Sequence, residues 1–223
     1  MWIERLRRMN WWRVTAHVIP WALLIWLGLD YLTGNLTVNP IQAATQRSGK
    51  YAVILLLASL ACTPLNTLFG WRGVNGARRA LGLYAFLFAL LHFTLFAGVD
   101  FGFDLNLLKR ELVERRYIWV GLPALLILTA LAATSFKSSM KRMGKNWKRL
   151  HRLVYLAGVL VVVHVGWAKK GDFLRLQGDI GLPLLFGSLL LLLLFLRLPV
   201  VRKAISAGRG RIQRRSVSLT PPE

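Results

Sequence analysis

Six uncharged apolar segments, separated by strongly basic stretches, constrain what this 223-residue chain can fold into. They span residues 14–29, 51–71, 80–99, 117–136, 153–168 and 180–196. Three reach the ~20 residues that a helix needs to cross about 30 Å of hydrocarbon, and snorkelling Arg and Lys side chains lengthen the others. Because backbone groups in lipid must be satisfied within each segment, we expect helices. The sequence therefore predicts an all-α membrane protein, with a six-helix transmembrane bundle over residues 14–198.

The distribution of charge predicts the orientation of this bundle. The formal net charge is +21, and 21 of the Lys and Arg residues lie in segments 1–13, 72–79 and 137–152 or after residue 196. The alternate loops hold the other nine cations and seven of the nine acidic residues. The positive-inside rule then puts both termini in the cytoplasm. We expect a basic cytoplasmic N-terminus over residues 1–13 and a basic, disordered cytoplasmic tail over residues 199–223.

Several classes of protein are excluded or disfavoured. A net charge of this size is typical of nucleic-acid-binding proteins, but here the cations avoid the apolar segments, which favours contact with the lipid bilayer instead. The only cysteine, Cys62, excludes an internal disulfide and a cysteine-built metal site. No Asp or Glu lies inside an apolar segment, which disfavours proton-coupled transport through carboxylates.

Two connections between the apolar segments have interpretable patterns. The stretch Asp30–Lys50, with Asn39-Pro40 in its middle, is predicted to be an extracytoplasmic loop. Residues Leu105–Arg116 are predicted to form a short amphipathic helix at the outer surface. No internal repeat is apparent.

The four histidines all lie in or at the ends of the predicted helices. By helical rise, His17 and His151 lie about 6 Å or less from the cytoplasmic edge, and His92 lies about 20 Å from it. His164 lies in the outer half as well, so His92 and His164 form an outer pair and His17 and His151 a possible inner pair. Histidine in hydrocarbon is costly without a partner, and two imidazoles facing each other across a gap can hold a b-type haem. The alternative is that each histidine only hydrogen-bonds a neighbouring helix.

Five motifs accompany these histidines. They are Gly144-Lys-x-Trp-x-x-Leu-His151-x-x-Val-Tyr-Leu, His164-x-x-Trp167, Thr63-Pro-Leu, Arg78-Arg-x-Leu-Gly-Leu and Leu91-His92. Together they resemble the MsrQ (YedZ) family of haem-binding membrane subunits. That family is part of the wider group of ferric-reductase-like transmembrane domains, which NADPH oxidases share.

The resemblance implies a haem b protein, with one haem or two, in the bacterial inner membrane, and it implies FMN as a further cofactor. Such a subunit takes electrons from the quinone pool and passes them outward to MsrP, a periplasmic molybdopterin enzyme that reduces methionine sulfoxide in oxidised proteins. The residues that correspond to haem-linked histidines are His92, His151 and His164. NADPH oxidases carry a further histidine at the position of Arg78.

Three functions follow from these observations. The first is an electron-transfer subunit of an oxidoreductase, with a quinol or a cytoplasmic flavin as donor. The second is another cytochrome b of the same fold with a different donor or acceptor. We expect no nicotinamide domain, because only 25 residues follow Leu198. The third is a non-redox membrane scaffold.

Overall fold

The computed structural model describes residues 10–169 and 179–218 of the chain, and within these residues it contains helices and no strand. The α-helices are α2 (Trp11–Leu32), α3 (Pro40–Phe69), α4 (Arg78–Thr94), α5 (Leu105–Glu114), α6 (Ile118–Ala133), α7 (Lys137–Met143), α8 (Lys145–His151), α9 (Leu153–Ala168), α10 (Gly181–Phe195) and α11 (Pro199–Ser218). A 3₁₀ turn, η1 (Arg72–Gly76), precedes α4, and a π-helix, η2 (Leu95–Asp100), continues it. The all-α prediction is confirmed.

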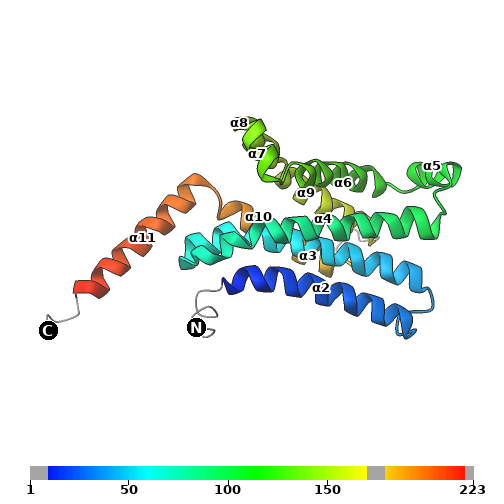
Figure 1. Cartoon of the computed structure of the whole chain (residues 1–223), viewed down its shortest axis with the longest axis horizontal. Coiled ribbons are helices and arrows are strands. Elements are labelled where there is room, and N and C mark those ends of the chain that lie inside the picture. The colour runs from blue at the N-terminus through cyan, green and yellow to red at the C-terminus, as the bar shows by residue number, and fades with distance from the viewer. Residues whose placement is uncertain (1–9, 170–178, 219–223) are drawn as a thin grey trace.

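The long apolar helices pack side by side (Figure 1). Four of them are long and apolar enough to cross a membrane, namely α2, α3, α4 continued by η2, and α8 continued by α9. The number rises to six if the bent pairs α5–α6 and α10–α11 each count as one span. Large apolar side chains face outward, and Trp26, Leu126 and Leu191 are each more than 60% exposed, as expected of surfaces in contact with lipid. The chain is a multi-pass membrane protein.

Helix α3 is the centre of the bundle and takes part in both main clusters of buried side chains. In one cluster, Leu55 and Leu56 pack against Ala85 and Phe88 of α4 and Ala157 of α9. In the other cluster, three further residues of α3 pack against α10. Ala85 and Ala157 are fully buried, and their small side chains let the helices approach closely.

The start of α3 corrects the loop that the sequence predicted over residues 30–50, because α3 begins at Pro40. The Asn39 side chain accepts a hydrogen bond from the Gln42 backbone N–H at 3.1 Å, and Pro40 occupies the first helical turn. An Asn-Pro pair is common in turns, but Asn is also a strong N-cap and Pro a good first helical residue. The 30 residues of α3 rise about 45 Å, which exceeds the hydrocarbon thickness of about 30 Å.

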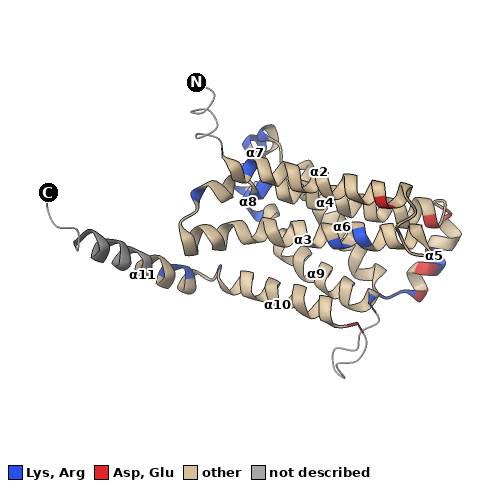
Figure 2. Ribbon diagram, turned by 90° about the horizontal axis from the view of Figure 1, so that it is seen from below, with Lys and Arg blue, Asp and Glu red and all other residues tan. Residues whose placement is uncertain are grey.

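The two ends of the bundle differ in charge. Helices α7 and α8, the start of α2 and the junction of α10 with α11 lie toward one end, and α5 and the α2–α3 connection lie toward the other (Figure 1). Figure 2 shows Asp and Glu gathered at the α5 end, whereas Lys and Arg predominate around α7 and α8. The described parts of the segments that the sequence assigned to the cytoplasm therefore lie toward one end.

The C-terminal segment differs from its prediction. Residues 199–218 form helix α11 in place of a disordered tail, and Pro199 begins it, where the missing N–H costs little. Of the predicted N-terminal segment 1–13, residues 1–9 lie outside the described residues. Residues 170–178 and 219–223 also lie outside them.

Candidate functional site

His92 on α4 and His164 on α9 face each other within the bundle. Their ring centroids are 6.0 Å apart, and the ring planes are nearly perpendicular, at 88°. Two imidazoles that ligate one metal ion from opposite sides, with bonds of about 2 Å each, have centroids roughly 6 Å apart. The spacing therefore fits two ligands of a single metal ion.

A backbone carbonyl holds each of these two rings. Nδ1 of His92 is 2.7 Å from the Thr45 carbonyl oxygen, and Nδ1 of His164 is 2.8 Å from the Tyr117 carbonyl oxygen. Because a carbonyl oxygen only accepts, Nδ1 is the protonated nitrogen and donates in both cases. This tautomer leaves Nε2 with a free lone pair, which is the arrangement that a metal ligand needs.

A glycine lies beneath each ring, one helical turn after the residue whose carbonyl holds it. A Cβ atom at Gly49 would lie 2.9 Å from Nδ1 of His92, and a Cβ atom at Gly121 would lie 2.5 Å from Nδ1 of His164. Real Cβ atoms do not come this close to another heavy atom, so any side chain here would displace the imidazole. Both positions therefore require glycine.

The two half-sites repeat the same pattern. We define half-site A as Thr45 and Gly49 of α3 with His92 of α4. We define half-site B as Tyr117, which directly precedes α6, Gly121 of α6 and His164 of α9. In both, 47 residues separate the histidine from the residue whose carbonyl it contacts. All three positions recur at a constant offset of 72 residues. The structure thus contains a local repeat that the sequence did not reveal.

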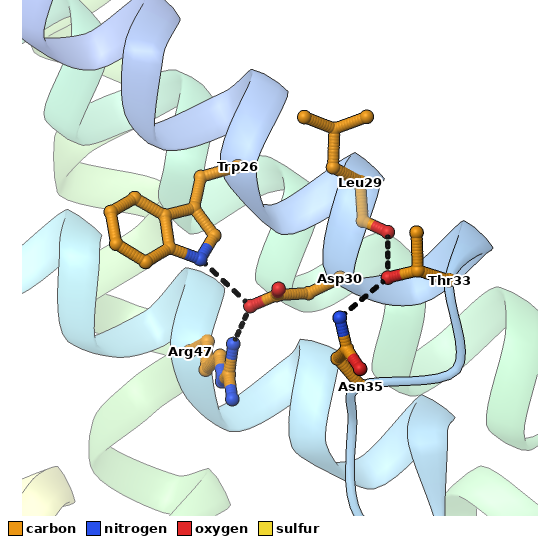
Figure 3. A network of polar contacts seen from close by, with 6 residues as sticks. All are labelled: Trp26, Leu29, Asp30, Thr33, Asn35 and Arg47. Carbon is orange, nitrogen blue, oxygen red and sulfur yellow. Dashed lines mark hydrogen bonds and ion pairs between the residues drawn. The ribbon is translucent and has the colours of Figure 1, made fainter.

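Polar contacts fix the part of α3 that carries Thr45. Asp30, near the end of α2, accepts a hydrogen bond from Nε1 of Trp26 at 2.9 Å and forms an ion pair with Arg47 of α3 (Figure 3). Beside it, the Thr33 hydroxyl donates to a backbone carbonyl and accepts from the Asn35 amide (Figure 3). The Asp30 carboxylate therefore ties α2 to α3 within two residues of half-site A.

The other two histidines have different surroundings. His17 is exposed on α2, and its Nδ1 is 3.0 Å from the Tyr84 hydroxyl. The ring of His151, at the end of α8, stacks on Trp147 with a centroid distance of 4.0 Å, and its Nε2 is 3.2 Å from the Thr134 hydroxyl. Within the described part of the chain, no ring contact or hydrogen bond joins His17 to His151. Their pairing stays a prediction.

The contact with Thr134 decides which nitrogen of His151 carries the proton. The Thr134 hydroxyl lies 2.7 Å from the Ala130 carbonyl oxygen, which can only accept. A hydroxyl has a single proton, so it is donated to that carbonyl and Nε2 of His151 donates to Thr134. The nitrogen left free is then Nδ1, the opposite of the arrangement in His92 and His164.

Comparison with known proteins identifies the family. Residues 48–162 match the family described as "Ferric reductase like transmembrane component". A curated relative from Rhodospirillum rubrum, named "Protein-methionine-sulfoxide reductase heme-binding subunit MsrQ", is 42% identical over 200 residues, which cover 89% of this chain and 92% of the relative. The chain belongs to the MsrQ family. The MsrQ protein of Bordetella pertussis is 39% identical over 80% of this chain and 83% of its own length. The MsrQ protein of Deinococcus radiodurans is 42% identical over 71% and 77%. No solved structure matches.

Sequence reasoning did not single out Thr45, Gly49, Tyr117 or Gly121. Thr45 and Tyr117 act through their backbone carbonyls, so the identity of their side chains gives no sequence signal. The one available signal was that Gly49 and Gly121 precede His92 and His164 by the same number of residues. None of the motifs that indicated the MsrQ family includes these four residues.

Proposed function

We propose that the chain is a membrane electron-transfer subunit that holds haem b between His92 and His164. The observation that carries this proposal is the ring pair itself, with centroids 6.0 Å apart and each Nδ1 proton donated to a backbone carbonyl. Haem bound between the two Nε2 atoms supplies reversible one-electron chemistry, which no side chain of the site provides. The names of the MsrQ relatives describe those proteins as heme-binding subunits.

The protein groups around the site have separable tasks. The Thr45 and Tyr117 carbonyls orient the rings and make the imidazoles more basic ligands. The two glycines let the backbone approach the rings, and the apolar cluster next to His92, which includes Phe88, limits the access of water. These groups define the geometry before any cofactor binds, so little reorganisation accompanies ligation.

A six-span arrangement with both termini in the cytoplasm accounts for the charge distribution. Under it, α2, α3, α4, α6, α9 and α10 cross the inner membrane in alternating directions, and the basic end with α7 and α8 faces the cytoplasm. The His92–His164 site then lies toward the periplasm, because Thr45 is in the first turns of α3 and Tyr117 precedes α6.

The donor and the acceptor are proposed from the family. The relatives' names place them in a protein-methionine-sulfoxide reductase system, so we assign a periplasmic molybdopterin methionine sulfoxide reductase, MsrP, as the acceptor. We assign the quinone pool as the donor. FMN, as a further cofactor or as a cytoplasmic donor, is a prediction from the resemblance.

A second haem at the cytoplasmic level is a separate prediction, with His151 as its ligand. In the structure Nε2 of His151 donates to Thr134, so ligation through this nitrogen requires the hydrogen bond to break. His17 is the proposed partner on α2. If His17→Ala leaves the haem stoichiometry and the reduction potentials unchanged, His17 is not a ligand.

The proposed function is tested by a visible spectrum and a transfer assay. Purified protein from haem-supplemented cells is expected to show a Soret band and sharp bands on reduction with dithionite. In vesicles of known orientation, a reduced quinol is expected to reduce the haem, and MsrP added outside is expected to reoxidise it. A purified, folded protein without a Soret band would favour a non-redox scaffold. Reoxidation only from the cytoplasmic side would reverse the proposed direction.

A further inference from the structure

A small basic pocket lies at the opposite end of the bundle from the His92–His164 pair. Its volume is about 220 Å³, and it is formed where α3 ends and where α4, α9 and α11 begin. Its polar lining consists of three guanidinium groups and three hydroxyl groups, from Arg78, Arg197, Arg202, Thr63, Thr67 and Tyr155. Among residues 10–169 and 179–218, no carboxylate lines it.

Arg197 is the least exposed of the three arginines. One of its terminal nitrogens, Nη1, donates to the Tyr155 hydroxyl at 2.6 Å, and the other, Nη2, donates to the Leu60 carbonyl at 2.6 Å. The guanidinium carbon also lies 5.3 Å from the centroid of the Tyr155 ring. The third nitrogen, Nε, is buried and has no hydrogen-bond partner in the described part of the chain. A buried donor without an acceptor is costly, so the Arg197 guanidinium is incompletely satisfied by the protein groups around it.

No ion pair among the described residues balances the charge of the pocket. The ion pairs among the described residues are Arg47 with Asp30, Arg110 with Glu114, Arg115 with Glu111, and Lys169 with Asp179. None of them involves a cation of the pocket. Three arginines that line one pocket, two of them exposed, favour an anion, and phosphate oxygens match the donor geometry of arginine.

The size and location of the pocket restrict the kind of anion. Pockets for drug-sized ligands measure about 300–1,000 Å³, so about 220 Å³ suits a single phosphate with a short ester group rather than a buried ring system. Basic pockets between transmembrane helices at the cytoplasmic side are typical sites for anionic lipid headgroups. We propose that this pocket binds a phosphate group, either the headgroup phosphate of an anionic phospholipid or a soluble phosphate.

The test compares Arg202→Gln with Lys203→Gln in the full-length protein. Arg202 lines the pocket and Lys203 does not, although the two are neighbours on α11 and carry the same charge. Binding of short-chain phosphatidylglycerol, of phosphatidylcholine and of inorganic phosphate is measured for each variant by native mass spectrometry in detergent. Arg202→Gln is expected to weaken binding of the preferred phosphate ligand about fivefold, which corresponds to about 1 kcal/mol per basic residue. Lys203→Gln is expected to leave it unchanged.

The outcomes separate the two sources of phosphate. Preferential binding of phosphatidylglycerol that depends on Arg202 supports the site and assigns it to lipid. Binding of inorganic phosphate with the same dependence supports the site and assigns it to a soluble phosphate. Equal effects of the two substitutions, or none, overturn the proposal. The haem spectrum of each variant reports independently whether the bundle is folded, and Arg202→Lys is expected to recover part of the affinity.

Discussion

The two pairs of histidines are held by different kinds of groups. Backbone carbonyls hold His92 and His164, whereas side-chain hydroxyls contact His17 and His151. A carbonyl only accepts, so it places the proton of His92 and of His164 on Nδ1. The Thr134 hydroxyl donates to the Ala130 carbonyl and therefore leaves the proton of His151 on Nε2. His92 and His164 therefore each present a free Nε2 lone pair. His151 must give up its hydrogen bond to Thr134 before its Nε2 can act in the same way, whereas His17 contacts Tyr84 through Nδ1.

The strongest test of this contrast removes the ligands themselves. His92→Ala and His164→Ala are each expected to abolish the outer haem completely, because one remaining imidazole does not give bis-histidine ligation. His151→Ala is expected to leave the outer haem bound. Haem per protein and the low-spin electron paramagnetic resonance signal measure both effects. An unchanged signal in His92→Ala would contradict the outer site.

Substitution of the glycines tests whether the outer pair depends on close backbone approach. Gly121→Ala is expected to lower haem affinity about 10- to 100-fold, the range found when the support of a metal ligand is altered. Gly49→Ala is expected to have a smaller effect, because its Cβ would lie 2.9 Å from the ring rather than 2.5 Å. The matched control is Gly28→Ala, where a Cβ meets nothing within 4 Å. Haem titration of the apoprotein gives the affinities, and equal values for all three variants would refute this role.

Removal of the Thr134 hydroxyl tests the rearrangement at the inner histidine. Thr134→Val frees Nε2 of His151 and is expected to strengthen haem binding at the inner level about fivefold, the equivalent of one hydrogen bond of about 1 kcal/mol. Thr129→Val in α6 is the control, since within the described residues that hydroxyl donates to the Leu125 carbonyl and has no hydrogen bond to a histidine. The measurement is the haem stoichiometry at limiting haem. Weaker binding in Thr134→Val would show that the hydroxyl supports the ligand instead.

The smallest expected effect concerns the ion pair between α2 and α3. Asp30→Asn leaves Arg47 without its carboxylate and is expected to destabilise the protein by about 1 kcal/mol, or about 3 °C in Tm. Glu114→Gln removes the exposed partner of Arg110 and is expected to change Tm by less than about 1 °C. Thermal unfolding monitored by circular dichroism measures both. Equal shifts would mean that the Asp30 contacts add no support to half-site A.

The sequence was sufficient to predict the helices, because these depend on the length and composition of the apolar segments. The predicted apolar segment 153–168 coincides with α9, and the other five apolar segments fall on helices whose ends differ by a few residues, apart from the start of α3. The start of α3 could not be placed, because Asn39-Pro40 is compatible with a turn and with a helix N-terminus. The depth of His92 and His164 could be estimated from helical rise, but their orientation could not. The Thr45 and Tyr117 carbonyls could not be predicted as hydrogen-bond acceptors of the two histidines, since every residue carries a carbonyl group.

The matched half-sites also have a consequence for how the bundle folds and assembles. Half-site A belongs to the α3–α4 hairpin and half-site B to the α6–α9 pair, so neither hairpin alone offers two ligands. Ligation across the pair would cross-link two halves of the chain that are otherwise joined by helix packing and by the α5 connection. The free energy of haem binding would then add to the free energy of association between the two hairpins. The supply of haem would therefore determine how much of the newly inserted chain reaches its final tertiary structure. Two fragments divided between α5 and α6 should accordingly reassemble in a haem-dependent manner.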